Sequence, residues 1–352
     1  MAGPVVDDVG TRMHRTHQQI LLPVTAVLLA VGLLAGSAVP LDVQAWLLVV
    51  GVAVLGMPHG ATDHLAGRSL LAGPCGGWWP LVFTAGYLGI AALVVSLWWL
   101  LAPLALAAFL LISIIHFGQE DSEQAPALGD WPGALQVPAR GSLLIVGAMA
   151  WAPGEVGAIF GWLVGGVWAE TLPAMLSPAQ PWLLLVWMLS AALLTAGHGL
   201  ESVRQTGRLR AGHLRSAVEV LLIALLPVVL PPLLAFIVYF CGWHSPRHFL
   251  QTASGLGVSA SARALRLAAG LCLPLTLASW LLLGTAYGVV AAWRPPSEAM
   301  VSVVFVGLSA LTVPHMLLSW LNSRRRSAVS APRRLRAEPM LHRAAGGRLA
   351  AR

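Results

Sequence analysis

Lysine is absent from this chain, and all 21 basic residues are arginine. Charged residues of both signs make up only 10% of the 352 residues, far below the share in soluble domains. The three cysteines, Cys75, Cys241 and Cys272, are isolated and form no CxxC pair. These scarcities exclude an ordinary soluble composition and a disulfide framework.

Hydrophobic residues, in contrast, make up 57% of the chain, and the mean hydropathy is +0.78. Several apolar runs approach or exceed the ~20 residues that a helix needs to cross a bilayer. The sequence therefore predicts an all-α protein, a single polytopic transmembrane helix bundle of about 8–10 spans. The expected spans are residues 20–38, 43–57, 78–100, 103–116, 141–167, 181–198, 217–242, 265–292 and 299–320.

The chain divides into three parts by composition. Residues 1–19 form a polar N-terminal extension, residues 20–321 the transmembrane bundle that carries the activity, and residues 322–352 an Arg-rich tail. Because the tail has nine Arg from Arg324 onward against one acidic residue, we expect a disordered cytoplasmic segment that faces anionic lipid. Nucleic-acid binding is not expected, since no aromatic residues or fold accompany this charge.

Prolines interrupt two of the predicted spans. Pro153 lies inside 141–167, which is therefore one broken span or a re-entrant element. Pro227, Pro231 and Pro232 favour two short segments that meet at the prolines.

The distribution of arginine predicts the orientation. With the Arg-rich tail inside, the arginine-bearing loops fall on the same side when 217–242 crosses twice. This arrangement gives about ten crossings, with both termini cytoplasmic.

Histidines recur at the ends of the apolar segments. Polar side chains are costly at membrane depth and so mark function, and imidazole has a lone pair that binds transition metals. In the predicted topology six of them reach the cytoplasmic level, so the set indicates a metal site near that face, although any single member is as readily a hydrogen-bonded interfacial residue. These six are His59, His116, His198, His244, His248 and His315.

The residues next to these histidines have less specific expected roles. Asp63 either supports a ligand histidine or caps its loop, and Arg247 contacts lipid phosphate or holds a carboxylate such as Asp63 or Glu120. Ser245 and Pro246 resemble a helix start, which would place His244 before the helix and His248 in its first turn. Glu120 and Asp121 are expected in a polar loop over 119–139, and surface positions are expected for His14, His17, His213 and His342.

The boxes also carry a resemblance. Pro58-His59-Gly60-Ala61-x-Asp63-His64, His116-Phe117-Gly118, Trp243-His244-Ser245-x-Arg247-His248 and Pro314-His315 resemble the Brp/Blh family of membrane-embedded β-carotene 15,15′-dioxygenases. The resemblance runs from the second span to the last. It implies a non-haem Fe(2+) enzyme of the cell membrane that cuts the central double bond of β-carotene with O2 into two retinals, with a rhodopsin as an expected recipient of the product.

The resemblance also implies residue roles. The four iron ligands would be His59, His116, His244 and His248, with no catalytic residue beyond them. His64, His198 and His315, with Asp63, would support the ligands or the structure. Neutral imidazole ligands would not neutralise the charge of iron(II), and four of them would leave positions open for O2. A carboxylate ligand would therefore count against the assignment. Phe117 and Trp243, next to ligands, are candidates to line an apolar substrate channel or to pack in the core.

Three rival functions stay open at this stage. A desaturase or hydroxylase would also be a membrane iron oxygenase, but no HxxHH box occurs. A transporter would account for the proline-broken helices, but the mid-span positions are apolar. A carotenoid or retinal binding factor without catalysis would survive mutation of His59.

Overall fold

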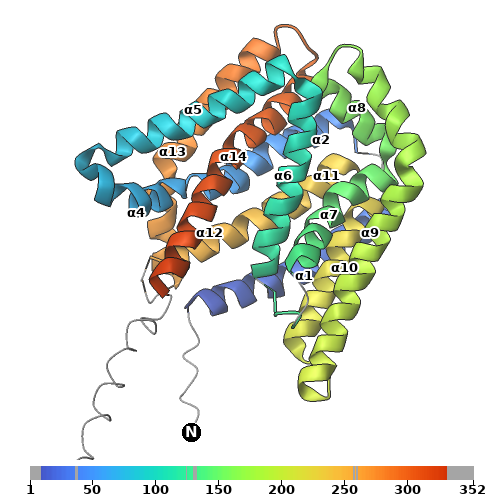
Figure 1. Ribbon diagram of the computed structural model, residues 1–352. Helices are drawn as coiled ribbons and strands as arrows, with labels where there is room; N and C mark the ends of the chain where they lie inside the picture. The colour runs from blue at the N-terminus through green and yellow to red at the C-terminus, as the bar shows by residue number, and fades with distance from the viewer. Residues whose placement is uncertain are drawn as a thin grey trace, which may run out of the picture.

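The computed structural model of the protein describes residues 9–35, 39–123, 125–129, 133–256, 258 and 261–330. Within these ranges the chain is helical and contains no strand, as predicted. Eight helical stretches are long and apolar enough to cross a membrane, and one of them, Leu41–Leu100, covers two of the predicted spans. The all-α multi-pass architecture is thus confirmed (Figure 1).

The helices follow one another with short connections. In chain order they are α1 (Val9–Ala35), α2 (Leu41–Gly51), the π-helix η1 (Val52–Gly56), α3 (Met57–Gly60), α4 (Asp63–Cys75), the 3₁₀ turn η2 (Gly76–Trp78), α5 (Trp79–Leu100), α6 (Ala102–Glu123), α7 (Gly133–Trp151), α8 (Pro153–Val164), α9 (Trp168–Thr206), α10 (Ala211–Val229), α11 (Pro232–Ile237), the π-helix η3 (Val238–His244), α12 (Ser245–Ser254), α13 (Ser261–Val290) and α14 (Pro296–Ser330). The structure describes the expected extension 1–19 only from Val9, where it is part of α1. It describes the expected tail 322–352 only up to Ser330, where it is part of α14.

Two groups of helices meet at the centre of the bundle. In Figure 1, α7, α9 and α10 form the group on the right, and α5, α13 and α14 the group on the upper left. α6 packs against α7 on one side and α5 on the other, while α12 contacts α1, α13 and η3. The four elements that carry the predicted metal ligands, α3, α6, η3 and α12, contact one another between the two groups.

Both proline-rich interruptions break the helix as expected. α7 ends at Trp151 and α8 begins at Pro153, where the missing N–H of proline costs nothing in the first turn. α10 ends at Val229, and the chain starts again at Pro232 with α11. Two segments do meet at these prolines.

The expected helix start at Ser245 is wrong. The helix runs without interruption from α11 through η3 into α12, and the Ser245 hydroxyl donates to the carbonyl oxygen of Gly56 instead of capping a helix. The π-helical stretch η3 ends two residues before Pro246, and η1 likewise ends two residues before Pro58. Because a π-helix shifts the hydrogen-bond pattern by one residue, it accommodates a proline that lacks its N–H.

Two glycines bring α6 and α7 into close contact. A Cβ atom at Gly118 would overlap the carbonyl oxygen of Val137, and one at Gly141 would overlap that of Ile114. Small residues allow such backbone contact between membrane helices. Since Gly118 lies two residues after His116, this contact also fixes the level of His116 in the bundle.

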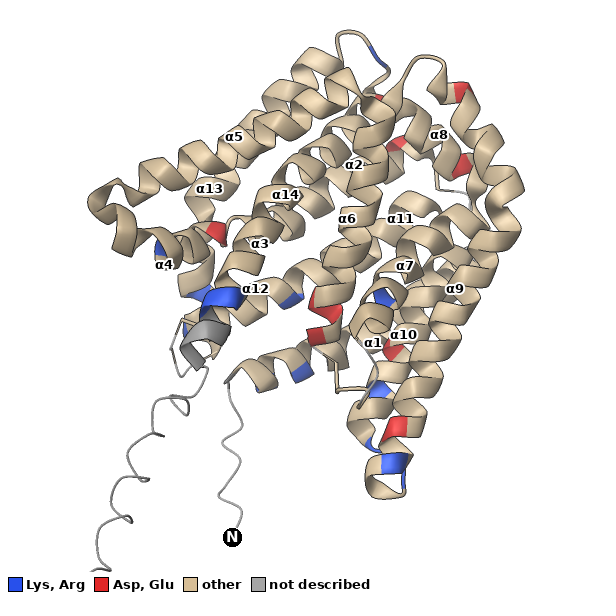
Figure 2. Cartoon of the chain, in the orientation of Figure 1, with Lys and Arg blue, Asp and Glu red and all other residues tan. Residues whose placement is uncertain are grey.

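The charged residues are distributed unevenly along the bundle. In Figure 2 the blue segments gather at the lower end, around α12, the start of α1 and the α9–α10 connection, with few at the upper end. Arg294, in the connection between α13 and α14, lies at the opposite end from these groups, where its guanidinium donates to the carbonyl oxygen of Trp162 in α8.

Candidate metal centre

Five histidines from separate elements converge on one point inside the bundle. Four of them are buried, with exposed fractions of 7% or less, and His248 is partly buried. They are His59 of α3, His116 of α6, His244 of η3, His248 of α12 and His315 of α14. The set predicted from the ends of the apolar segments is thus brought together, with the exception of His198.

The rings are close enough to share a cation. The centroid of the His59 ring lies 4.3 Å from that of His248, 4.7 Å from that of His315 and 5.2 Å from that of His244. The Nε2 atoms of His244 and His116 are 3.1 Å apart. Because the helix runs continuously through Ser245, His244 and His248 lie one turn apart and both face the cluster.

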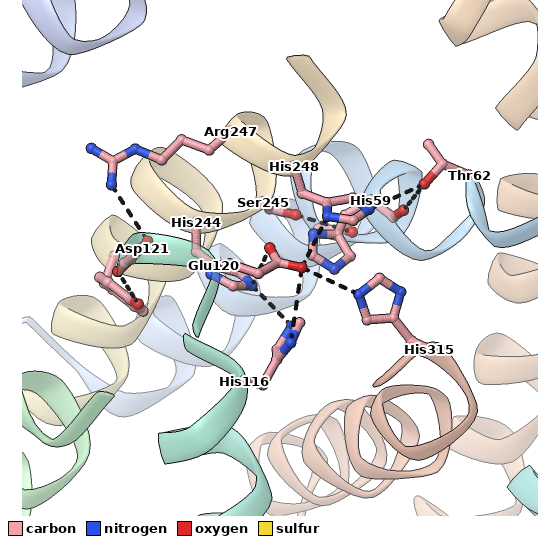
Figure 3. A network of polar contacts seen from close by, with 12 residues as sticks. His59, Thr62, His116, Glu120, Asp121, His244, Ser245, Arg247, His248 and His315 are labelled. Atoms are coloured by element: carbon pink, nitrogen blue, oxygen red, sulfur yellow. Dashed lines mark hydrogen bonds and ion pairs between the residues drawn. The ribbon is translucent and has the colours of Figure 1, made fainter. Parts of the chain in front are cut away.

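Glu120 lies among these rings (Figure 3). Its Oε1 accepts a hydrogen bond from His248 Nδ1 at 3.0 Å and lies 3.6 Å from His315 Nε2; its Oε2 lies 3.7 Å from His244 Nε2. The sequence placed Glu120 in a loop, but α6 continues to Glu123 and carries it into the site. The H-x-x-x-E spacing from His116 is the signal that would have revealed it, since residues i and i+4 share a helix face.

The donor atoms fit a first-row metal ion. Two sets of four have donor atoms within 4.8 Å of one another: His59, His116, Glu120 and His244, and His59, Glu120, His248 and His315. Three buried ring nitrogens, His59 Nδ1, His244 Nδ1 and His315 Nε2, have no hydrogen-bond partner. Buried polar atoms without a partner are costly, and imidazole suits iron and its neighbours. The cluster could therefore hold a metal.

A second polar group supports the cluster from behind. Arg247, between His244 and His248, makes an ion pair with Glu219 of α10 at 2.6 Å and another with Asp121 of α6 at 3.4 Å. Asp121 also accepts a hydrogen bond from the Tyr239 hydroxyl. Burial alone would lower the pKa of Arg247, but the two carboxylates outweigh it and raise that pKa. Arg247 is thus a buried permanent charge that ties α12 to α6 and α10, not a lipid contact.

Three of the expected site residues lie outside the cluster. His64 is half-buried, and its Nδ1 hydrogen-bonds the carbonyl oxygen of Ala61. His198 forms a separate buried group with Arg140 and His213, at 2.6 Å and 3.4 Å. The indole of Trp243 donates to Thr25, and Trp243 is not among the residues that line the cavity beside the cluster.

Four histidines were expected at the surface. His213 is only 5% exposed, so that expectation is wrong for it; the α9–α10 connection folds the ring against His198. His14 and His17 are both half-buried, and His17 Nε2 lies 2.9 Å from the carbonyl oxygen of Gly242. His342 lies outside the described residues.

A cavity of about 260 Å³ opens beside the cluster. Its inner end is formed by His59, Asp63, His116 and His315, with Phe117, Phe109, Phe236 and Phe240 along the wall. Its outer end is formed by side chains of α5 and α13, of which Leu88, Leu275 and Leu282 are 53%, 40% and 61% exposed. The cavity is therefore an apolar passage from the outer face of the bundle to the imidazoles.

Comparisons with known proteins show the family of this chain. Residues 50–322 match the family model described as Beta-carotene 15,15'-dioxygenase, a range that includes every residue of the cluster. A β-carotene 15,15'-dioxygenase from uncultured marine bacterium 66A03 is 31% identical over 277 residues, which is 78% of this chain and 92% of the relative. A probable β-carotene 15,15'-dioxygenase Blh from Halobacterium salinarum is 28% identical over 299 residues, 78% of this chain and 83% of the relative. No solved structure matches the chain.

Proposed function

Because this chain belongs to the β-carotene 15,15′-dioxygenase family, we propose that it cleaves the central double bond of β-carotene with O2. The 15,15′ bond breaks, and each of its two carbons takes one oxygen atom, so that the products are two molecules of all-trans-retinal. The observation that carries this proposal is the cluster of buried imidazoles at the inner end of an apolar passage.

The cofactor that we propose is Fe(2+), held by the imidazoles of His59, His116, His244 and His248. When bound, iron(II) supplies the redox chemistry that O2 needs to react with an alkene. The protein holds the four rings in one buried site by placing them on four packed elements.

Glu120 has a positioning role in this proposal. Its carboxylate accepts the hydrogen bond from His248 Nδ1, so the lone pair of the neutral ring lies on Nε2, which is 3.4 Å from the Thr62 hydroxyl. This arrangement is compatible with all-imidazole ligation, although Glu120 is also close enough to bind the metal.

The substrate reaches the site from the bilayer. A long polyene partitions into the hydrocarbon core, and the passage between α5 and α13 is apolar and open on the outer face of the bundle. Phe117, Phe236 and Phe240 line the inner part beside the imidazoles and would hold the middle of the chain. None of the residues that line the outer part of the passage is charged. The passage therefore excludes water and guides an apolar molecule to the site.

Filling the mouth of this passage is expected to slow cleavage. Leu282→Trp should lower the rate of retinal formation by about tenfold, equivalent to ~1.4 kcal/mol, because the larger ring obstructs the gap between α5 and α13. Stability should not change, since Leu282 is exposed. The matched control is Leu281→Trp, because Leu281 is 74% exposed and does not line the passage. The route would be ruled out if both variants lost the same fraction of the rate of retinal formation, or if neither lost any.

The location follows from the same reasoning. We propose that the protein is a multi-pass protein of the cell membrane with both termini in the cytoplasm, supported by the concentration of arginine at one end of the bundle (Figure 2). Retinal released into the bilayer could pass to a rhodopsin, which is the partner that we propose.

Expression in a bacterium engineered to accumulate β-carotene tests the function. We expect the orange pigment to disappear and retinal to accumulate, as measured by chromatography of the extracts, with an empty vector as control. Apocarotenals of other lengths would show that another double bond is cleaved. Unchanged β-carotene in iron-replete cells with verified membrane expression would rule out the activity.

A further inference from the structure

We propose that His315 is a fifth imidazole ligand of the metal centre, held in place by Asp63 and Tyr87. This inference rests on the proposed iron site and extends it. His315 comes from α14, the last transmembrane helix, and is 2% exposed.

The tautomer of His315 is fixed by its surroundings. Its Nδ1 donates to Asp63 Oδ1 at 2.7 Å, so in the neutral ring the lone pair lies on Nε2. That Nε2 is buried and has no hydrogen-bond partner; the carboxylate nearest to it is Glu120, at 3.6 Å. A histidine with only a structural role would satisfy both nitrogens, because an unpaired buried nitrogen costs stability.

The ring faces the other candidate ligands. Its centroid lies 4.7 Å from that of His59, 5.0 Å from that of His248 and 5.1 Å from that of His116 (Figure 3). All three distances are shorter than those from His59 to His244 and His116 in the same cluster, 5.2 Å and 5.9 Å. His315 is therefore as close to the centre as the four ligands already proposed.

Asp63 is in turn fixed by a tyrosine. Its Oδ2 accepts a hydrogen bond of 2.8 Å from the Tyr87 hydroxyl of α5, while its Oδ1 accepts from His315. Metal-bound histidines commonly donate their other N–H to a carboxylate, which orients the ring and makes it a stronger donor. Tyr87, Asp63 and His315 form this arrangement and all three line the substrate passage.

A fifth imidazole would change what the metal can bind. With a fifth imidazole bound, the ion would have fewer positions open to O2 and water than with four. The alkene, which the apolar wall of the passage would hold, would need no bond to the metal. The inference therefore assigns Asp63 and Tyr87 as positioning residues and His315 as a ligand.

Cobalt binding tests the inference without reference to activity. The full-length protein is purified in detergent, freed of metal, and titrated with Co(II), and the visible absorption of the bound ion is recorded. We expect His315→Ala to raise the dissociation constant by at least about tenfold and to change the spectrum, and Asp63→Asn to raise it by about tenfold. Tyr87→Phe, which removes only a hydroxyl, should have a smaller effect in the same direction.

Two controls separate a ligand from a structural residue. Added imidazole should restore the affinity of His315→Ala, because it can occupy the vacated position, and His64→Ala should bind as the wild type does, since His64 lies next to Asp63 but outside the cluster. Thermal unfolding of the metal-free proteins identifies any variant that fails to fold. If His315→Ala fails to fold, Asp63→Asn and Tyr87→Phe test the inference in its place. Wild-type affinity and spectrum in His315→Ala would overturn the inference, whereas absence of binding in the wild type would overturn the proposed metal site itself.

Discussion

Replacement of His244 by alanine is expected to lower retinal formation by at least about a hundredfold, beyond the ten- to hundredfold loss typical for groups that only support a metal ligand. The ring is 1% exposed, its Nδ1 has no hydrogen-bond partner, and its Nε2 lies 3.1 Å from that of His116. Its loss would remove a donor from the centre of the cluster. Chromatography of pigments from β-carotene-accumulating cells measures the effect.

The control for this prediction is another buried histidine. His198 is fully buried but lies with Arg140 and His213, away from the cluster. His198→Ala should therefore lower retinal formation only as far as it lowers the amount of folded protein in the membrane, which immunoblotting measures. Substantial retinal formation in His244→Ala at equal protein level would show that His244 is not a ligand.

Replacement of Arg247 by methionine is expected to cost about 3–5 kcal/mol of the free energy of unfolding. The side chain is 3% exposed and neutralises Glu219 and Asp121, which are 4% exposed each. Without it, the two buried carboxylates would lose the cation that makes an ion pair with each of them. Chemical unfolding in detergent, followed by circular dichroism, measures the loss.

A compensating variant tests the cause. Arg247→Met combined with Glu219→Gln removes one of the unpaired carboxylates and should recover part of the lost stability. Gln18, whose amide donates to Glu219, would retain an acceptor in the glutamine. If the single variant unfolds as the wild type does, the ion pairs do not hold α12 in place.

The fold was accessible from the sequence because its determinants are local. Long apolar runs predict membrane helices, and Pro153 and Pro232 each lie where a new helix begins. The helix through Ser245 and Pro246 was not predicted, because a proline usually marks a helix start. Only the tertiary structure reveals that the π-helical stretch η3 absorbs it.

The sequence predicted that histidines from several helices meet, but it did not predict every residue of the cluster correctly. Shared membrane level predicts which histidines can meet, and it correctly grouped those of α3, α6, η3, α12 and α14. The depth of a residue in the membrane does not give its lateral position in the bundle. His198 was therefore grouped with these histidines, although it lies among α7, α9 and α10. Glu120 was missed because the apolar run ends at His116, while the helix continues for about two more turns.

The composition of the cluster also bears on the rival functions. A di-iron desaturase site would need about eight histidines in HxxHH boxes, and the described part of the chain brings five to this centre. The family match and the relatives favour the dioxygenase instead. The single carboxylate at the centre, Glu120, is the feature that the all-imidazole expectation did not include.

Iron titration tests the central claim most directly. The purified protein is freed of metal, loaded anaerobically with increasing Fe(II), and then mixed with β-carotene and O2, while bound iron and retinal are both quantified. We predict that retinal formation rises in proportion to bound iron, saturates at about one iron per chain, and is negligible in iron-free protein. Retinal formation by the iron-free protein, or equal iron binding and activity in His244→Ala, would contradict the account.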